Sequence, residues 1–164
     1  MKFFIAAAAC ALSLGFTAQA SAQALIAQRN ISLDAALQAA STALETCRKN
    51  GYKVTVTVLD RSGRTRVVLH DDNVSPHTIE NAHRKAYTAL TFRMASGEMG
   101  KRIAANPTAT APLLLANVTS AEGALPIKAG DDIVGSIGVS GAPGGDKDAV
   151  CSQSGIDKIA AGLK

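Results

Sequence analysis

The chain has 164 residues, a formal net charge of +4 and few aromatic side chains, with no tryptophan, two tyrosines and four phenylalanines. Its lysines and arginines are scattered rather than gathered into a stripe, and there is little aromatic surface on which bases could stack, so the composition argues against nucleic-acid binding. The length predicts one domain with a hydrophobic core of its own.

The N-terminal segment has the pattern of a secretory signal peptide. Lys2 precedes an uncharged apolar run from Phe3 to Phe16, which is shorter than the ~20 residues that a bilayer span needs. Two overlapping small-x-small sites follow this run. The sequence therefore predicts a signal peptide over residues 1–22, cleaved near residue 20 or 22, and a periplasmic or secreted domain over residues 23–164 without a membrane span.

A helix and a hairpin are predicted next. Ser32 stands as a helix N-cap and Gly51 lies just past the helix end. Apolar residues recur between them every three or four positions: Leu33, Ala36, Leu37, Ala40, Ala43, Leu44 and Cys47. Residues 53–59 then alternate in the manner of a strand, residues 60–63 are typical of a turn, and a second apolar run covers residues 67–69.

Two helices are predicted in the middle of the chain. The first begins after Ser75-Pro76, because proline is tolerated in a first helical turn, and runs to about Phe92. A shorter helix from Ser96 to Ala105 ends at Asn106-Pro107. Residues 107–120 have no clean period, and we expect a loop with a short strand there.

The C-terminal third predicts a second hairpin and a last helix. Residues 125–128 and 133–139 are strands around a turn at 129–131, and the glycines of the later strand indicate close approach by another backbone or a ligand. Asp146 is expected to cap a helix that carries Val150, Ile156, Ile159 and Leu163. The predicted fold class is α+β, a single layered domain with a central antiparallel sheet flanked by helices, in the order α-ββ-αα-βββ-α.

Two cysteines remain once the signal peptide, which carries Cys10, is removed. Cys47 and Cys151 make an even number in a compartment that permits disulfides. A bridge between them and a pair of buried thiols are both compatible with the sequence.

Familiar catalytic signatures are missing from the sequence. Residues 138–142 approach a nucleophile elbow but have alanine at the last glycine position. The loop from Gly141 to Gly145 could bind an anion through its N–H groups, but it has neither P-loop nor dinucleotide spacing, which favours a plain turn. We therefore assign no catalytic residue, and a binding protein is favoured over an enzyme.

Three histidines lie close together in the sequence, at His70, His77 and His83, with Asp71 and Asp72 after the first. Histidine is the commonest metal ligand and a usual axial ligand of haem iron, so all three are candidate metal ligands. His77 and His83 fall on opposite faces of a regular helix, and they could share a metal only if His77 precedes the helix. The competing interpretation is that each histidine is a surface or packing residue.

Two segments resemble a known family. The segment AHRKAYTALTF at 82–92 resembles the KA-x-TA-x-x-F helix of the GlcG/HbpS-like haem-binding proteins, and GSIGVSG at 135–141 resembles their GxIGVSG strand and loop. The first helix, the strand and turn over 54–63 and residues 151–155 are also similar. The resemblance extends over about residues 31–163 in the family's order.

The resemblance implies a single α+β domain that assembles into homo-oligomers. Some members of the family are secreted and bind haem or iron, one of them with a redox-sensing partner protein, and others accompany glycolate or propanediol metabolism. The motif positions Lys85, Thr88 and Phe92 carry over as residues of the pocket region. No axial ligand carries over, because ligating positions differ between members.

Together these observations predict an exported haem- or iron-binding protein that acts as carrier, buffer or redox-sensor component. Haem needs an iron donor and cations for its propionates; His77 and His83 are the candidate donors, and Arg84 and Lys85 the candidate cations. One alternative is a protein or enzyme for glycolate-like hydroxy acids, with Arg84 or Lys85 and the Gly141 loop holding the carboxylate. The other is an oligomeric structural or interaction protein without a ligand.

Overall fold

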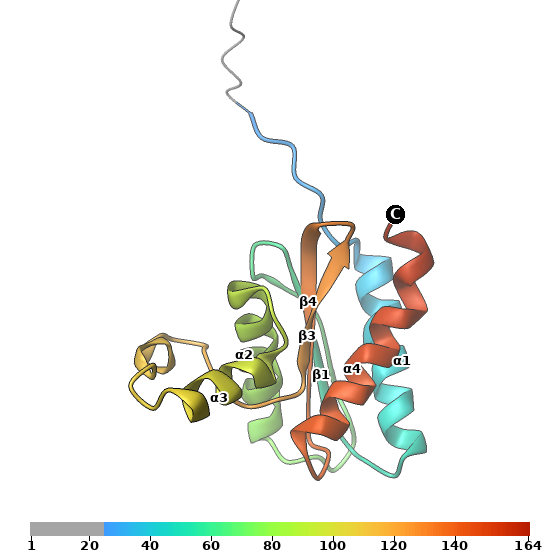
Figure 1. Cartoon of the computed structure of the whole chain (residues 1–164). Helices are drawn as coiled ribbons and strands as arrows, with labels where there is room; N and C mark the ends of the chain where they lie inside the picture. The colour runs from blue at the N-terminus through green and yellow to red at the C-terminus, as the bar shows by residue number, and fades with distance from the viewer. Residues whose placement is uncertain (1–24) are drawn as a thin grey trace, which may run out of the picture.

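The computed structural model describes residues 25–164, and the predicted signal peptide lies outside them. The described chain forms one four-stranded antiparallel sheet with helices on both faces (Figure 1). This confirms the predicted α+β class. No helix in the described part of the chain is long and apolar enough to cross a membrane.

The sheet has the order β2-β1-β4-β3. Two hairpins build it, the first from β1 (Thr55–Asp60) and β2 (Thr65–His70), the second from β3 (Ala124–Ala129) and β4 (Asp132–Ser140). The hairpins join through an antiparallel pairing of β1 with β4, which leaves β2 and β3 as the edge strands.

Helices α1 (Leu33–Lys49) and α4 (Gly145–Ile159) pack side by side against one face of the sheet (Figure 1). The Ser32 hydroxyl accepts a hydrogen bond from the Ala35 N–H, as expected of an N-cap. The core between these helices and the sheet is built mainly of alanine, valine and isoleucine. A disulfide joins Cys47 of α1 to Cys151 of α4, and both residues are fully buried, which settles the question that the sequence left open.

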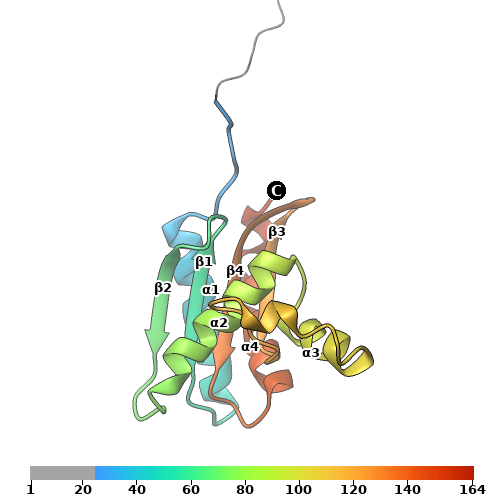
Figure 2. The ribbon, with the colours of Figure 1, turned by 90° about the vertical axis from the view of Figure 1, so that its left-hand side faces the viewer.

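Helix α2 (His77–Phe92) crosses the other face of the sheet over β1, β4 and β3 (Figure 2). It approaches β4 closely at Gly138, where a Cβ atom would collide with the Ala82 carbonyl and the Ala86 amide of α2. This glycine therefore marks contact with another backbone, one of the two alternatives that the sequence predicted. Because helices cover both faces, every residue of β1 is buried.

The segment after α3 (Ser96–Ala105) differs from the prediction. Residues 107–120 contain no strand; a 3₁₀ helix, η1 (Ala111–Leu114), stands there instead, with Leu114 and Leu115 exposed. Prolines at 107 and 112 remove backbone donors that a strand would use. The last group of strands therefore has two members rather than three.

Three details of the terminal helices also differ from the prediction. Helix α4 has Gly144 as its N-cap, and Asp146 lies inside its first turn without capping it. Leu163 follows the helix, after the short 3₁₀ helix η2 (Ala160–Gly162). Three apolar side chains that were expected on the buried faces are about half exposed: Leu33, Leu37 and Val150. The buried face of α1 is instead built mainly of alanines.

Candidate functional site

The three histidines occupy different environments around the junction of β2 and α2. His70 is the last residue of β2 and is exposed; His77 is the first residue of α2 and is also exposed. His83 lies six positions further along α2, half-buried, with its ring stacked on Tyr87 at a centroid distance of 6.2 Å. Since His77 belongs to the helix, it does not share a face with His83.

No three His, Cys, Asp or Glu side chains within residues 25–164 come together in an arrangement that could hold a metal ion. The three histidines therefore do not form one shared metal site here.

His70 is connected to the first turn of α2 by hydrogen bonds. Its Nδ1 atom lies 2.7 Å from the Thr55 hydroxyl, and the Thr55 hydroxyl lies 2.7 Å from the Thr78 hydroxyl. Thr78 in turn donates to the Ser75 carbonyl oxygen at 2.7 Å. Both threonines are fully or almost fully buried, so this row of hydroxyls is sheltered from water while the histidine at its end is not.

Arg84, a predicted cation for ligand carboxylates, is partly engaged by the protein itself. Its Nη2 atom donates to the Val118 carbonyl oxygen at 2.7 Å, and its Nη1 atom lies 3.6 Å from a carboxylate oxygen of Glu80. The side chain keeps 38% of its surface exposed. Arg84 therefore remains partly accessible to a ligand.

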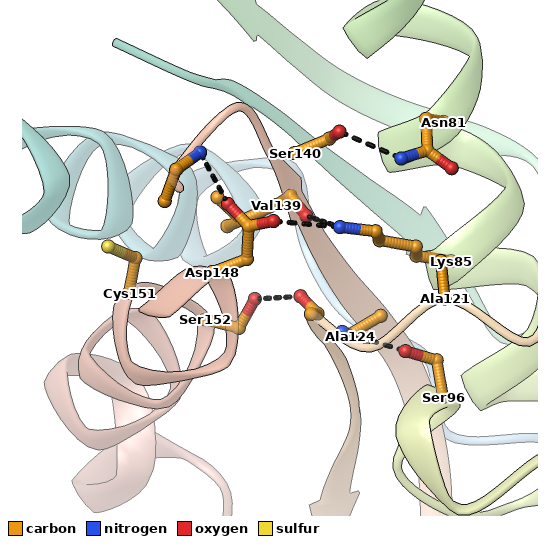
Figure 3. A network of polar contacts seen from close by, with 12 residues as sticks. Asn81, Lys85, Ser96, Ala121, Ala124, Val139, Ser140, Asp148, Cys151 and Ser152 are labelled. Carbon is orange, nitrogen blue, oxygen red and sulfur yellow. Dashed lines mark hydrogen bonds and ion pairs between the residues drawn. The ribbon is translucent and has the colours of Figure 1, made fainter. Parts of the chain in front are cut away.

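Lys85, the other predicted cation, points into the protein and forms a buried ion pair (Figure 3). Its Nζ atom donates to the Asp148 carboxylate at 2.8 Å and to the Val139 carbonyl oxygen at 3.0 Å. Both side chains of the pair are 4% exposed. The expectation that Lys85 meets a ligand carboxylate is thus replaced by a structural role, in which it ties α2 to β4 and α4.

Asp148 is the centre of this network. Burial raises the pKa of its carboxyl above the usual aspartate value, against the opposing effects of Lys85 and of the loop N–H groups that favour the charged form. Its second oxygen accepts a hydrogen bond from the Ala142 N–H at 3.0 Å. That loop N–H is therefore already occupied by an internal carboxylate.

Thr88 and Phe92, the remaining motif positions, also belong to the packing of α2. The Thr88 hydroxyl donates to the Arg84 carbonyl oxygen and accepts from the Thr119 N–H at 2.9 Å. Phe92 is the last residue of α2 and is half-buried. Lys85 and Thr88, two positions of the motif that carries the family resemblance, thus hold the helix in place.

A cleft that the sequence did not predict lies between the β1–β2 turn and the C-terminal half of α2. It has a volume of about 290 Å³. Arg61 and Arg93 contribute cations, Tyr87 and Leu90 contribute one wall, and Arg61 also faces Asp132 at 3.5 Å. These residues come from a turn, a helix and a helix end, and no local motif connects them.

Comparison with known proteins shows what the chain resembles. Residues 31–157 match the family model described as "Haem degrading protein HbpS-like". No protein with a curated description matches. Among solved structures, a double mutant of HbpS from Streptomyces reticuli is 34% identical, covers 93% of this chain and 97% of its own, and superposes with a TM-score of 0.76.

Two more distant structures share the fold. The Klebsiella pneumoniae protein ORFY is 22% identical, with 84% of this chain and 96% of that chain covered and a TM-score of 0.78. PduOC, solved as a complex with haem, is also 22% identical, with 79% and 95% covered and a TM-score of 0.72. The family model covers most of the sequence and agrees with the structural match at 34% identity. The chain belongs to the HbpS-like family.

Proposed function

We propose that the protein is exported and binds haem through a surface histidine, acting as a carrier, buffer or sensor component. The observation that carries this proposal is the β2–α2 junction, by which we mean Val68 and His70 of β2 with His77 and Ile79 of α2. All four side chains are exposed, and Val68 and Ile79 are 43% and 44% exposed although both are apolar. A donor for iron and apolar surface for a porphyrin are thus present together.

Two requirements of haem, an iron donor and apolar surface, are present at this junction. Imidazole nitrogen is a usual ligand of haem iron, and either exposed histidine can supply it. Arg84, about two turns beyond His77 on α2, is a partly exposed cation of the same helix that could serve a propionate. When bound, haem would supply the redox and oxygen chemistry, while the protein would bind and orient it.

The family supports the same conclusion. The family model describes haem-degrading proteins, and PduOC, which shares the fold, was solved with haem bound. Homo-oligomer formation and a sensor-protein partner stay predictions. Light scattering on the purified protein checks the first, because it measures the mass of the particle directly.

Export is supported by two independent features. Lys2 and the apolar run behind it have the pattern of a signal peptide. The disulfide between Cys47 and Cys151 is of a kind that forms and persists in oxidising compartments and is rare in the cytosol. Mass spectrometry of the protein recovered from the periplasm or medium should give an N-terminus at residue 21 or 23; an intact Met1 would contradict export.

Haem binding is tested by titrating purified mature protein with hemin and recording the visible spectrum. The proposal predicts a shifted Soret band that saturates at a fixed ratio of haem to chain. The spectrum of free hemin throughout the titration would overturn it. The same spectra followed over time report degradation of bound haem, as loss of the Soret band.

The cleft between the β1–β2 turn and α2 favours a second candidate function, binding of a small carboxylate. Arg61 and Arg93 are the cations in its wall, and a guanidinium can hold a carboxylate by two parallel hydrogen bonds. We expect glycolate to raise the melting temperature of the protein but not that of Arg93→Ala. An equal effect of glycolate on both proteins, or no effect on either, would exclude this candidate.

A further inference from the structure

The row of hydrogen bonds that ends at His70 has a fixed direction. Its inner end is the Ser75 carbonyl oxygen, which can only accept a hydrogen bond. The Thr78 hydroxyl, 2.7 Å away, must therefore donate its one proton to this oxygen. The contact between the hydroxyls of Thr55 and Thr78, also 2.7 Å, then needs Thr55 as its donor. The donor at the buried end of the row therefore determines which group donates in each of the other hydrogen bonds.

The last step of the row determines which ring nitrogen of His70 carries the proton. The Thr55 hydroxyl has given its proton to Thr78, so it can only accept from the Nδ1 atom of His70 at 2.7 Å. The neutral ring then has its proton on Nδ1 and its free electron pair on Nε2. Because His70 is exposed at the end of an edge strand, we expect that electron pair to face outward.

This is the arrangement of a metal-binding histidine. Such histidines almost always donate their second ring N–H to an acceptor of the protein, which fixes the tautomer and the orientation of the ring. At His70 the acceptor is Thr55, held by Thr78 and finally by a backbone carbonyl. His70, the outermost member of the row, can therefore coordinate iron through the free electron pair of Nε2.

The other two histidines lack this support. Among the hydrogen bonds formed by residues 25–164, none involves the ring of His77 or His83. His83 is half-buried against Tyr87, which leaves its ring less accessible than that of His70. Val68 precedes His70 by two positions on the same face of β2 and adds exposed apolar surface next to it.

We infer that His70 is the histidine that binds haem iron, through Nε2, and that Thr55 and Thr78 are positioning residues that hold the ring in the required tautomer. This inference rests on the proposed haem-binding function. It departs from the sequence-based expectation, which placed the axial donor at His77 or His83.

The tautomer can be tested without haem. In ¹⁵N NMR spectra of the apo protein at a pH where the rings are neutral, His70 should show a protonated Nδ1 and an unprotonated Nε2. Thr55→Val removes the acceptor and should abolish this preference, whereas Thr55→Ser keeps a hydroxyl and should retain it. A proton on Nε2 in the wild-type protein would overturn the inference, whatever the protein binds.

Hemin titration of single variants tests the ligand itself. We expect His70→Ala to lose the spectrum of a histidine-bound iron, and His77→Ala and His83→Ala to keep it. Thr55→Val should bind hemin about tenfold more weakly than Thr55→Ser, the lower end of the effect of removing such a partner, and circular dichroism checks that both remain folded. If the wild-type protein binds hemin but His70→Ala keeps its spectrum, the inference fails while haem binding stands. If the wild-type protein gives no shift, the proposed function itself fails.

Discussion

The buried ion pair of Lys85 and Asp148 is expected to be important for the stability of the fold. Both are charged and almost completely buried, and each has hydrogen-bond partners besides the other. Removing one member of such a pair leaves an uncompensated buried charge. Lys85→Met should therefore lower the free energy of unfolding by about 3–5 kcal/mol, measured by denaturant titration.

The loss in Lys85→Met should also depend on pH. Burial already raises the pKa of Asp148 above its ordinary value of 3.8, and without Lys85 the pKa rises further. A carboxyl whose pKa is higher in the folded state than in the unfolded state makes the fold less stable as pH rises between the two values. The difference in the free energy of unfolding between wild type and Lys85→Met should thus become smaller as pH falls from neutral towards about 4.

Lys101→Met is the matched control for this prediction. Lys101 also contacts a carboxylate, that of Glu98 at 2.7 Å, but its side chain is 71% exposed. Exposed pairs contribute little to stability. A loss in Lys85→Met no greater than in Lys101→Met would mean that the buried pair does not hold α2 and α4 in place.

The role of a single residue could be predicted from the sequence where its partner is a neighbour in the chain, and could not where its partner is distant. The N-cap at Ser32 could be predicted, because capping depends on residues three positions apart. The role of Lys85 could not, because its partner lies 63 positions away on another helix. The link between His70 and Thr78 is equally invisible in the sequence, since it passes through Thr55 on a neighbouring strand.

Among the elements, the contact of α2 with β4 depends on the absence of a side chain at Gly138. A Cβ atom there would collide with the backbone at Ala82 and Ala86, and backbone cannot move as a side chain can. Gly138→Ala should therefore cost about 1–3 kcal/mol of stability in a denaturant titration. Gly162→Ala, where a Cβ would meet nothing within 4 Å, should leave stability near that of wild type. Equal stability of the two variants would refute this account of the helix–sheet contact.

The disulfide links helices α1 and α4 covalently. It joins residues 104 positions apart and so closes most of the described chain into one loop. Restricting so long a loop in the unfolded state is expected to stabilise the fold by about 2–4 kcal/mol. The double variant Cys47→Ala with Cys151→Ala should unfold at correspondingly lower denaturant concentration than the oxidised wild type. If their midpoints coincide, the bridge contributes nothing to stability.

The helices and strands were largely predictable, because their patterns are periodic. Alternation identified β1, and three-to-four spacing identified α1 and α2. The prediction of a strand within residues 107–120 was wrong, because the apolar cluster near the prolines of this segment follows neither the strand nor the helix period. The cleft could not be predicted at all, because Arg61, Tyr87 and Arg93 meet only after the hairpin turn and α2 have packed.

At the scale of the whole molecule, the two faces of the sheet differ. The α1–α4 face is closed by tightly packed small residues and a disulfide, whereas α2 leaves the edge strand β2 largely uncovered (Figure 2). The exposed histidines and apolar side chains of the β2–α2 junction lie on this less covered side. A rigid scaffold on one side and an accessible edge on the other is an arrangement suited to holding a ligand.

In this member of the HbpS-like family, His70 is the proposed ligand of haem iron. Hemin titration of the mature wild-type protein beside His70→Ala, with the Soret region recorded, tests it most directly. We expect a saturable shifted band for wild type and loss of the histidine-bound spectrum in the variant. The free-hemin spectrum in wild type, or the same shifted band in both proteins, would contradict it.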